Sequence, residues 1–255
     1  MYITNEQKID LNNLELLSDK GSECVVYKYN NRAIKIFRKE YIFSHLTLEE
    51  IYYLSKIPTK RILFPIGPVL DNNHKAAGYI MPLITNEKNI QKESMKRIFY
   101  EMQIIQKDLN LLSKHNICLF DIGQSNCIYN GKLFLIDPGN YIINNISNIK
   151  KQLDPLNLCS DNNILLKKWN ENKINQLFDS LLFSQNAKID SYQHRLIVQF
   201  FQKEKDKKKI NYNLDVFKEF FDENMTVENA VLNFMQKHIK EDEKERAWYL
   251  ASREK

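Results

Sequence analysis

The hydrophobic pattern of this chain changes its period near residue 85, and this change limits the possible folds most strongly. Before residue 85, apolar residues come in short runs rich in β-branched and aromatic side chains. After residue 92, they recur at three- and four-residue spacing, which favours amphipathic helices. The predicted strands are 24–29, 32–37 and 77–81, and the predicted helical regions are 95–112, 172–183 and 226–250. We therefore expect an α+β fold with a sheet first and helices after it.

Two local features refine this expectation. A single helix should interrupt the strands, because Leu48, Ile51, Tyr52 and Leu54 form one apolar stripe that ends before Pro58. Further along, Asn130-Gly131 separates two β-prone runs, 127–129 and 132–136. Asn-Gly tolerates the positive φ angles of a type I′ turn, so these runs predict a tight hairpin with a two-residue loop.

Composition excludes several classes of protein. With 255 residues, 43% of them hydrophobic, 6 Gly, 6 Pro and a net charge of +5, the chain is neither disordered nor fibrous. Apolar runs are about ten residues long, about half of what a membrane-spanning helix needs, and residues 1–6 show no secretory signal. The four cysteines form no CxxC pair, which favours reduced thiols in the cytoplasm. The basic run 203–209 lacks interleaved aromatic residues, so we expect no nucleic-acid partner.

Polar residues flank the predicted hairpin. Asp121 and Asn126 precede its first strand, and Asp137 follows its second strand. Because a hairpin returns the chain to its starting level, Asn126 and Asp137 should be neighbours at its open end. Carboxylate and amide oxygens suit Mg²⁺, which usually also keeps waters and bound phosphates. Asp121 would then be free to orient an attacking hydroxyl.

Further candidates precede the hairpin in the sequence. A glycine turn at Gly21 runs into the strand 24–29, and Lys35 lies within the otherwise apolar strand 32–37. A lysine is rarely buried without an anionic partner, although its stem alone can cover apolar surface while the amine reaches water. The following helix offers Glu50 as that partner, with the adjacent Glu49 as the alternative.

Taken in chain order, these features resemble the protein kinase superfamily over most of residues 14–140. Residues 21–26 look like the later part of the glycine-rich loop, and residues 78–83 look like the strand that leads into the hinge. Residues 121–126 look like the catalytic loop, and Asp137-Pro138-Gly139 looks like the metal-binding element. The resemblance implies a two-lobed kinase-like α+β fold. Its parts would be a β-rich lobe at 1–82, a hinge at 83–92 and a helical lobe at 93–255.

The resemblance also assigns roles to individual residues, with ATP and Mg²⁺ as cofactors. Asp121 would orient the acceptor hydroxyl and accept its proton, while Lys35, held by Glu50, would bind phosphates. Asn126 and Asp137 would bind Mg²⁺. The nucleotide would contact Gly21, Val26, Ala33, Lys35, Met81 and Leu83.

Departures from the family pattern leave the acceptor open. Asp19 and Cys24 stand where the loop usually has glycine, and Leu119-Phe120 stands where His-Arg usually precedes the catalytic Asp. Gly123 replaces the lysine typical of protein Ser/Thr kinases, and no Ala-Pro-Glu element follows Gly139. We favour a protein Ser/Thr kinase. The alternatives are a small-molecule kinase of the aminoglycoside or choline kinase type and a nucleotide-binding pseudokinase that serves as a binding module.

Overall fold

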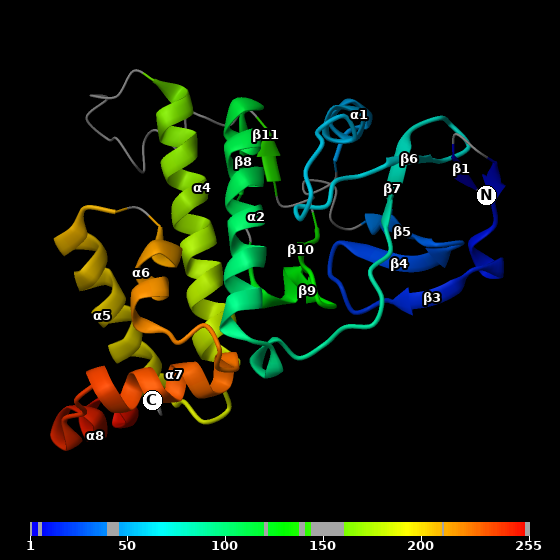
Figure 1. The fold of residues 1–255 in the computed structure, drawn as a ribbon. Helices are drawn as coiled ribbons and strands as arrows, with labels where there is room; N and C mark the ends of the chain where they lie inside the picture. The colour runs from blue at the N-terminus through cyan, green and yellow to red at the C-terminus, as the bar shows by residue number, and fades with distance from the viewer. Residues whose placement is uncertain are drawn as a thin grey trace.

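The chain folds into an α+β structure with a sheet at one end and most of the helices at the other (Figure 1). The computed structural model describes residues 2–4, 7–39, 46–119, 122–137, 141–143, 161–210 and 212–252. A seven-stranded antiparallel sheet has the order β2-β1-β6-β7-β5-β4-β3. Its strands are β1 (Tyr2–Ile3), β2 (Lys8–Ile9), β3 (Glu15–Ser18), β4 (Cys24–Tyr29), β5 (Arg32–Phe37), β6 (Gly67–Leu70) and β7 (Ala76–Pro82). The predicted strands 24–29 and 32–37 are confirmed at both ends, and 77–81 is one residue longer at each end.

The two faces of the sheet bury different residues. On β5, Ile34 and Ile36 join a small outer cluster, whereas Ala33 and Phe37 belong to or pack against the main core on the inner face. This alternation follows from the two-residue period of a strand. Lys35 therefore points to the inner face, where it is only 7% exposed.

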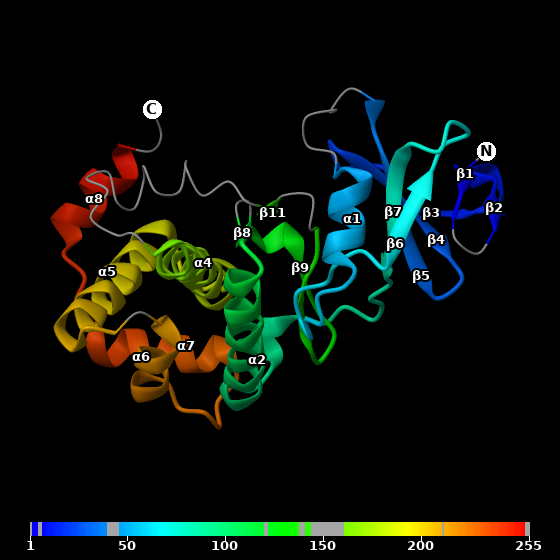
Figure 2. The ribbon, with the colours of Figure 1, turned by 90° about the horizontal axis from the view of Figure 1, so that it is seen from above.

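One helix lies against the sheet, and the other helices lie farther from it. The predicted helix at 48–54 is confirmed as α1 (Leu48–Leu54), which lies beside the sheet (Figure 2) with Ile51 and Leu54 buried and Tyr52 exposed. The predicted helix at 95–112 is confirmed as α2 (Met95–Lys114). Farther from the sheet are α4 (Asn162–Asp179), continued by a π-helix (Ser180–Ser184), then α5 (Ser191–Lys208), α6 (Asn213–Phe220), α7 (Val227–His238) and α8 (Glu243–Ala251).

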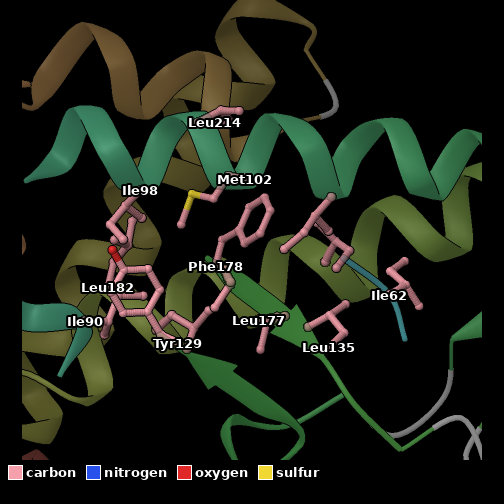
Figure 3. Packing of buried hydrophobic residues seen from close by; sticks show 14 of the residues in the cluster. Ile62, Ile90, Ile98, Met102, Tyr129, Leu135, Leu177, Phe178, Leu182 and Leu214 are labelled. Carbon is pink, nitrogen blue, oxygen red and sulfur yellow. The ribbon is translucent and has the colours of Figure 1, made fainter. Parts of the chain in front are cut away.

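The main core connects the sheet, the helices and a hairpin. In Figure 3, Met102 of α2 faces Phe178 of α4, and Leu135 lies on the hairpin side of the same cluster. The predicted apolar stripe of α2 is entirely buried, each residue being at most 2% exposed. Its residues are Ile98, Phe99, Met102, Ile105, Leu109 and Leu112.

The hairpin consists of β9 (Cys127–Tyr129) and β10 (Leu133–Leu135), and it lies between α2 and the sheet (Figures 1 and 2). The predicted hairpin is confirmed, but its loop is one residue longer than predicted. Because Leu133 pairs with Tyr129, the loop contains three residues, Asn130, Gly131 and Lys132. Gly131 has φ = 101°. A short second ribbon pairs β8 (Ile117–Leu119) with β11 (Tyr141–Ile143).

The expectation of one continuous helix over 226–250 is wrong. After α7, Ile239 adopts extended dihedral angles, and Asp242 caps a new helix by accepting from the N–H groups of Lys244 and Glu245. Helix α8 then packs on α5 through the rings of Tyr192 and Tyr249, whose centroids are 5.6 Å apart. Among the described residues, no helix combines the length and the apolar character that crossing a membrane requires.

Gly78 is required by the close approach of β7 to β5. A Cβ atom built at this position would lie 2.0 Å from the backbone oxygen of Lys35, which cannot move without disturbing the sheet. We expect Gly78→Ala to lower the free energy of unfolding by about 1–3 kcal/mol, as overpacking does. Urea denaturation measures this. Gly123→Ala, whose Cβ would meet only Ser125 Oγ at 3.6 Å, should change stability far less, and equal losses would contradict the steric argument.

Candidate functional site

A cavity of about 620 Å³ lies between the sheet and the open end of the hairpin. This volume is in the range of small-molecule and cofactor sites. Its walls come from the β3–β4 turn, from the inner faces of β4, β5 and β7, and from the segments next to β9 and β10. The structure thus brings together eight of the predicted site residues: Gly21, Val26, Ala33, Lys35, Met81, Leu83, Asn126 and Asp137.

Lys35 and Asp137 meet inside this cavity. The Lys35 Nζ atom lies 3.1 Å from Asp137 Oδ1, and the exposed fractions of the two side chains are 9% and 25%. The lysine is therefore not a stem that covers apolar surface with its amine in water, which was the alternative left open by the sequence. It holds a positive charge against a carboxylate in a partly dehydrated site, where electrostatic interactions are stronger than in water.

The hairpin places Asn126 next to Asp137, as the sequence predicts. The N–H of Ile136 donates to the backbone oxygen of Asn126 at 2.8 Å, which fixes the two ends of the hairpin side by side. Asp137 has φ = 71°, in the left-handed region that Asp and Asn adopt more readily than most residues. The carboxylate therefore leaves the end of β10 at an angle set by an uncommon backbone conformation.

The predicted ion pair between Lys35 and Glu50 is not formed among the described residues. Glu50 Oε2 instead accepts from the backbone N–H of Thr47 at 2.8 Å and from the Thr47 hydroxyl at 3.0 Å. Thr47 in turn accepts from the Glu50 N–H, which completes a capping box at the start of α1. Glu50 therefore stabilises its own helix, and Glu49, the alternative partner, is exposed. The Thr-x-x-Glu spacing that produces this arrangement is visible in the sequence.

Cys24 lies in the wall of the cavity close to Lys35 and Asp137. Burial raises the pKa of its thiol from 9.0 to about 12, and the nearby Lys35 offsets this only in part. A thiol with such a pKa is neutral at physiological pH and is a poor nucleophile. Cys24 therefore acts as a small side chain at a position where glycine would have left more room.

The hairpin is anchored to α2 by an ionic network around one buried carboxylate, that of Glu101. Glu101 is fully buried and accepts from Arg61 Nε at 2.5 Å and from Arg97 Nη2 at 3.2 Å. The same carboxylate accepts from the N–H of Leu133 on β10 at 3.2 Å, and Arg97 Nε donates to Gly131 O at 3.0 Å. The position of the hairpin, and with it that of Asp137, depends on this network.

The predicted catalytic residue Asp121 lies outside the described residues, as do Pro138 and Gly139. The strand that precedes it in the sequence, β8, is held tightly by α4. Trp169 Nε1 donates to Leu119 O at 2.6 Å, and Asn170 Oδ1 accepts from Leu119 N at 2.9 Å. Asn170 Nδ2 also donates to Ile117 O at 2.9 Å. The chain is therefore fixed two residues before Asp121.

The donor set in the cavity fits a hard cation that is shared with a ligand. Asp137 supplies carboxylate oxygens, and the adjacent Asn126 supplies an amide oxygen, which are the donor types that Mg²⁺ prefers. Within the described ranges, no group of three or more His, Cys, Asp or Glu side chains gathers as a metal cluster. This is compatible with Mg²⁺, which is commonly bound through one or two carboxylates together with substrate phosphates.

Sequence reasoning missed two groups of residues at this site. Ile128 and Ile136 line the cavity from the hairpin, and their alternation with the buried Tyr129 and Leu135 could have revealed them. The others, Ser18, Lys20, Ser22 and Glu23, line it from the end of β3 and from the β3–β4 turn. Polar turn residues of this kind carry no periodic signal.

No family model matches the chain, and no curated protein matches it in sequence. The fold and the arrangement of side chains in the cavity are therefore the basis of the functional argument.

Proposed function

We propose that this protein is a member of the protein kinase superfamily that transfers the γ-phosphate of ATP to a hydroxyl group, with protein Ser/Thr as the favoured acceptor. The observation that carries this proposal is the 3.1 Å contact between Lys35 Nζ and Asp137 Oδ1 inside a 620 Å³ cavity. The chain order of the predicted motifs led to these two residues, which are far apart in sequence.

The two ends of the cavity suit the two ends of ATP. Val26, Ala33, Met81 and Leu83 supply apolar side chains for the flat adenine ring. Lys35 supplies a cationic group for the phosphates, and the turn at Gly21 supplies backbone amides. Phosphoryl transfer needs little covalent chemistry from the protein, so positioning and charge stabilisation account for most of the catalysis.

Mg²⁺ would be held by Asp137 and Asn126, and it would neutralise charge on the phosphates. In this arrangement, Asp137 also orients the Lys35 amine toward the same phosphates. Asp121 is proposed to orient the acceptor hydroxyl and to take up its proton. Trp169 and Asn170 support this role because they hold the strand that leads to Asp121.

The first experiment measures thermal unfolding with ATP and Mg²⁺. Ligand at 100 times its dissociation constant should stabilise the folded state by about 2.7 kcal/mol. Lys35→Met should remove most of this stabilisation, because it leaves Asp137 without its cation. Transfer of labelled γ-phosphate to a protein mixture, to the protein itself and to a metabolite panel then tests catalysis. Asp121→Asn is the matched inactive variant, and transfer that survives this substitution would contradict the assignment.

A second candidate function, a nucleotide-binding module without turnover, is favoured by the position of Glu50. Its carboxylate is used in the capping box of α1 rather than on Lys35. Stabilisation by ATP and Mg²⁺ without transfer to any acceptor would favour this function over catalysis.

A further inference from the structure

The β3–β4 turn, residues 19–23, lies over one end of the cavity and is held by a residue outside the predicted site. Arg38 directly follows β5, and its Nε donates to Gly21 O at 2.9 Å. Its Nη2 donates to Asp19 O, and its backbone N–H donates to Glu23 O at 2.8 Å. One arginine thus binds three carbonyl groups at alternating positions of the turn.

Arg38 acts from the side of the sheet that faces away from the cavity. Lys35 and Phe37 point to the inner face of β5, and Ile34 and Ile36 point to the outer face. The two-residue alternation of the strand puts Arg38 on the side of Ile36. Consistent with this, Arg38 is not among the described residues that line the cavity.

The orientation of the carbonyls fixes the orientation of the amides. In a trans peptide unit, the C=O of one residue and the N–H of the next point in opposite directions. Because the carbonyls of Asp19 and Gly21 point to Arg38, the N–H groups of Lys20 and Ser22 point away from it, and both residues line the cavity. The N–H of Lys20 donates to Ser18 Oγ, which lines the cavity, at the long distance of 3.4 Å, so a phosphate that binds this amide would have to replace that hydrogen bond.

We propose that Arg38 is a positioning residue that turns the backbone amides of the β3–β4 turn toward the phosphates of the bound nucleotide. This inference rests on the proposed function and gives Arg38 a role in nucleotide binding. The turn contains only one glycine, so its backbone is held in place by an external guanidinium rather than left to adjust around the ligand. A preorganised turn does not have to be ordered when the ligand binds, which improves affinity.

The proposal predicts an effect that depends on the phosphates. Calorimetric titration with ATP plus Mg²⁺ and with adenosine separates phosphate recognition from base recognition. For Arg38→Gln we expect ATP affinity to fall about tenfold, which corresponds to about 1.4 kcal/mol, and adenosine affinity to change less than about twofold. Arg38→Lys keeps the charge but cannot bridge two carbonyls, so it should lose ATP affinity in the same way.

Lys28→Gln is the matched control. It also removes one positive charge from the β3–β4 ribbon, where Lys28 pairs with Glu15 at 2.8 Å, but it does not touch the turn. Its ATP affinity should stay within about twofold of the parent protein.

Several outcomes would overturn the assignment of Arg38. Equal losses of ATP and adenosine affinity would indicate a general structural role, and parent-like ATP affinity in Arg38→Lys would indicate a role of charge alone. Unchanged ATP affinity in Arg38→Gln would overturn this inference and leave the proposed function intact. If the parent protein bound neither ligand, the proposed function would fail together with the inference.

Discussion

Asp137→Asn should reduce phosphoryl transfer by at least about 10²- to 10³-fold, the size of effect seen when one charge-stabilising group is removed from an active site. Asparagine keeps the shape of the side chain and tolerates the left-handed backbone, here φ = 71°. It loses the negative charge that holds Lys35 at 3.1 Å and that would hold Mg²⁺. The chemistry should therefore fail while the fold persists.

Transfer of labelled phosphate measures the activity of this variant, and thermal unfolding checks its fold. Asp10→Asn is the control, because Asp10 is exposed, and Asn serves equally well as the cap of the short helix at 11–13. We expect control activity within about twofold of the parent protein. If Asp137→Asn retained full activity, the proposed metal and lysine roles of this carboxylate would be wrong.

Glu101→Gln should cause the largest loss of stability, about 3–5 kcal/mol, because it removes one partner of the buried ion pair between Arg61 and Glu101. The substitution leaves the guanidinium groups of Arg61 and Arg97 without their shared carboxylate. Glutamine has only one acceptor oxygen, so its NH2 group must face a donor, either Arg97 or the N–H of Leu133. Urea denaturation measures the change in the free energy of unfolding.

Glu49→Gln is the control for this experiment. Glu49 is an exposed glutamate on α1, and its replacement should change stability by no more than about 0.5 kcal/mol. A similarly small loss for Glu101→Gln would mean that the network contributes little, and that apolar packing alone keeps the hairpin on α2.

Local periodicity predicted the elements on which the cavity is built. The bounds of β4 and β5 follow from short runs of β-branched and aromatic residues, and the buried stripe of α2 follows from three- and four-residue spacing. The hairpin was predicted from Asn130-Gly131, although its loop is longer by one residue. Backbone pairing, rather than the identity of the turn residues, decides which of them belong to the loop.

Competing local interactions account for two predictions that were wrong, the Lys35–Glu50 ion pair and the continuous helix over 226–250. Glu50 resembles a partner for Lys35, but the hydroxyl and N–H of Thr47 are only three residues away, and the Glu50 carboxylate forms a capping box with them instead. The helix expected over 226–250 is interrupted because the Asp242 side chain accepts from backbone N–H groups and so begins a new helix, α8. Contacts between distant segments, such as those of Arg38 and Asn170, leave no trace in periodicity.

The continuity of the main core determines how this molecule can be divided. One cluster of buried side chains runs from Ala33, Tyr79 and Met81 in the sheet to Phe217 and Phe234 in the helices. Side chains where the sheet meets the helices would lose part of this cover in either half alone, so we expect unfolding to be a single cooperative event. We expect a chain cut between residues 83 and 92 to give two fragments that expose apolar side chains, aggregate when separate and fold only when mixed.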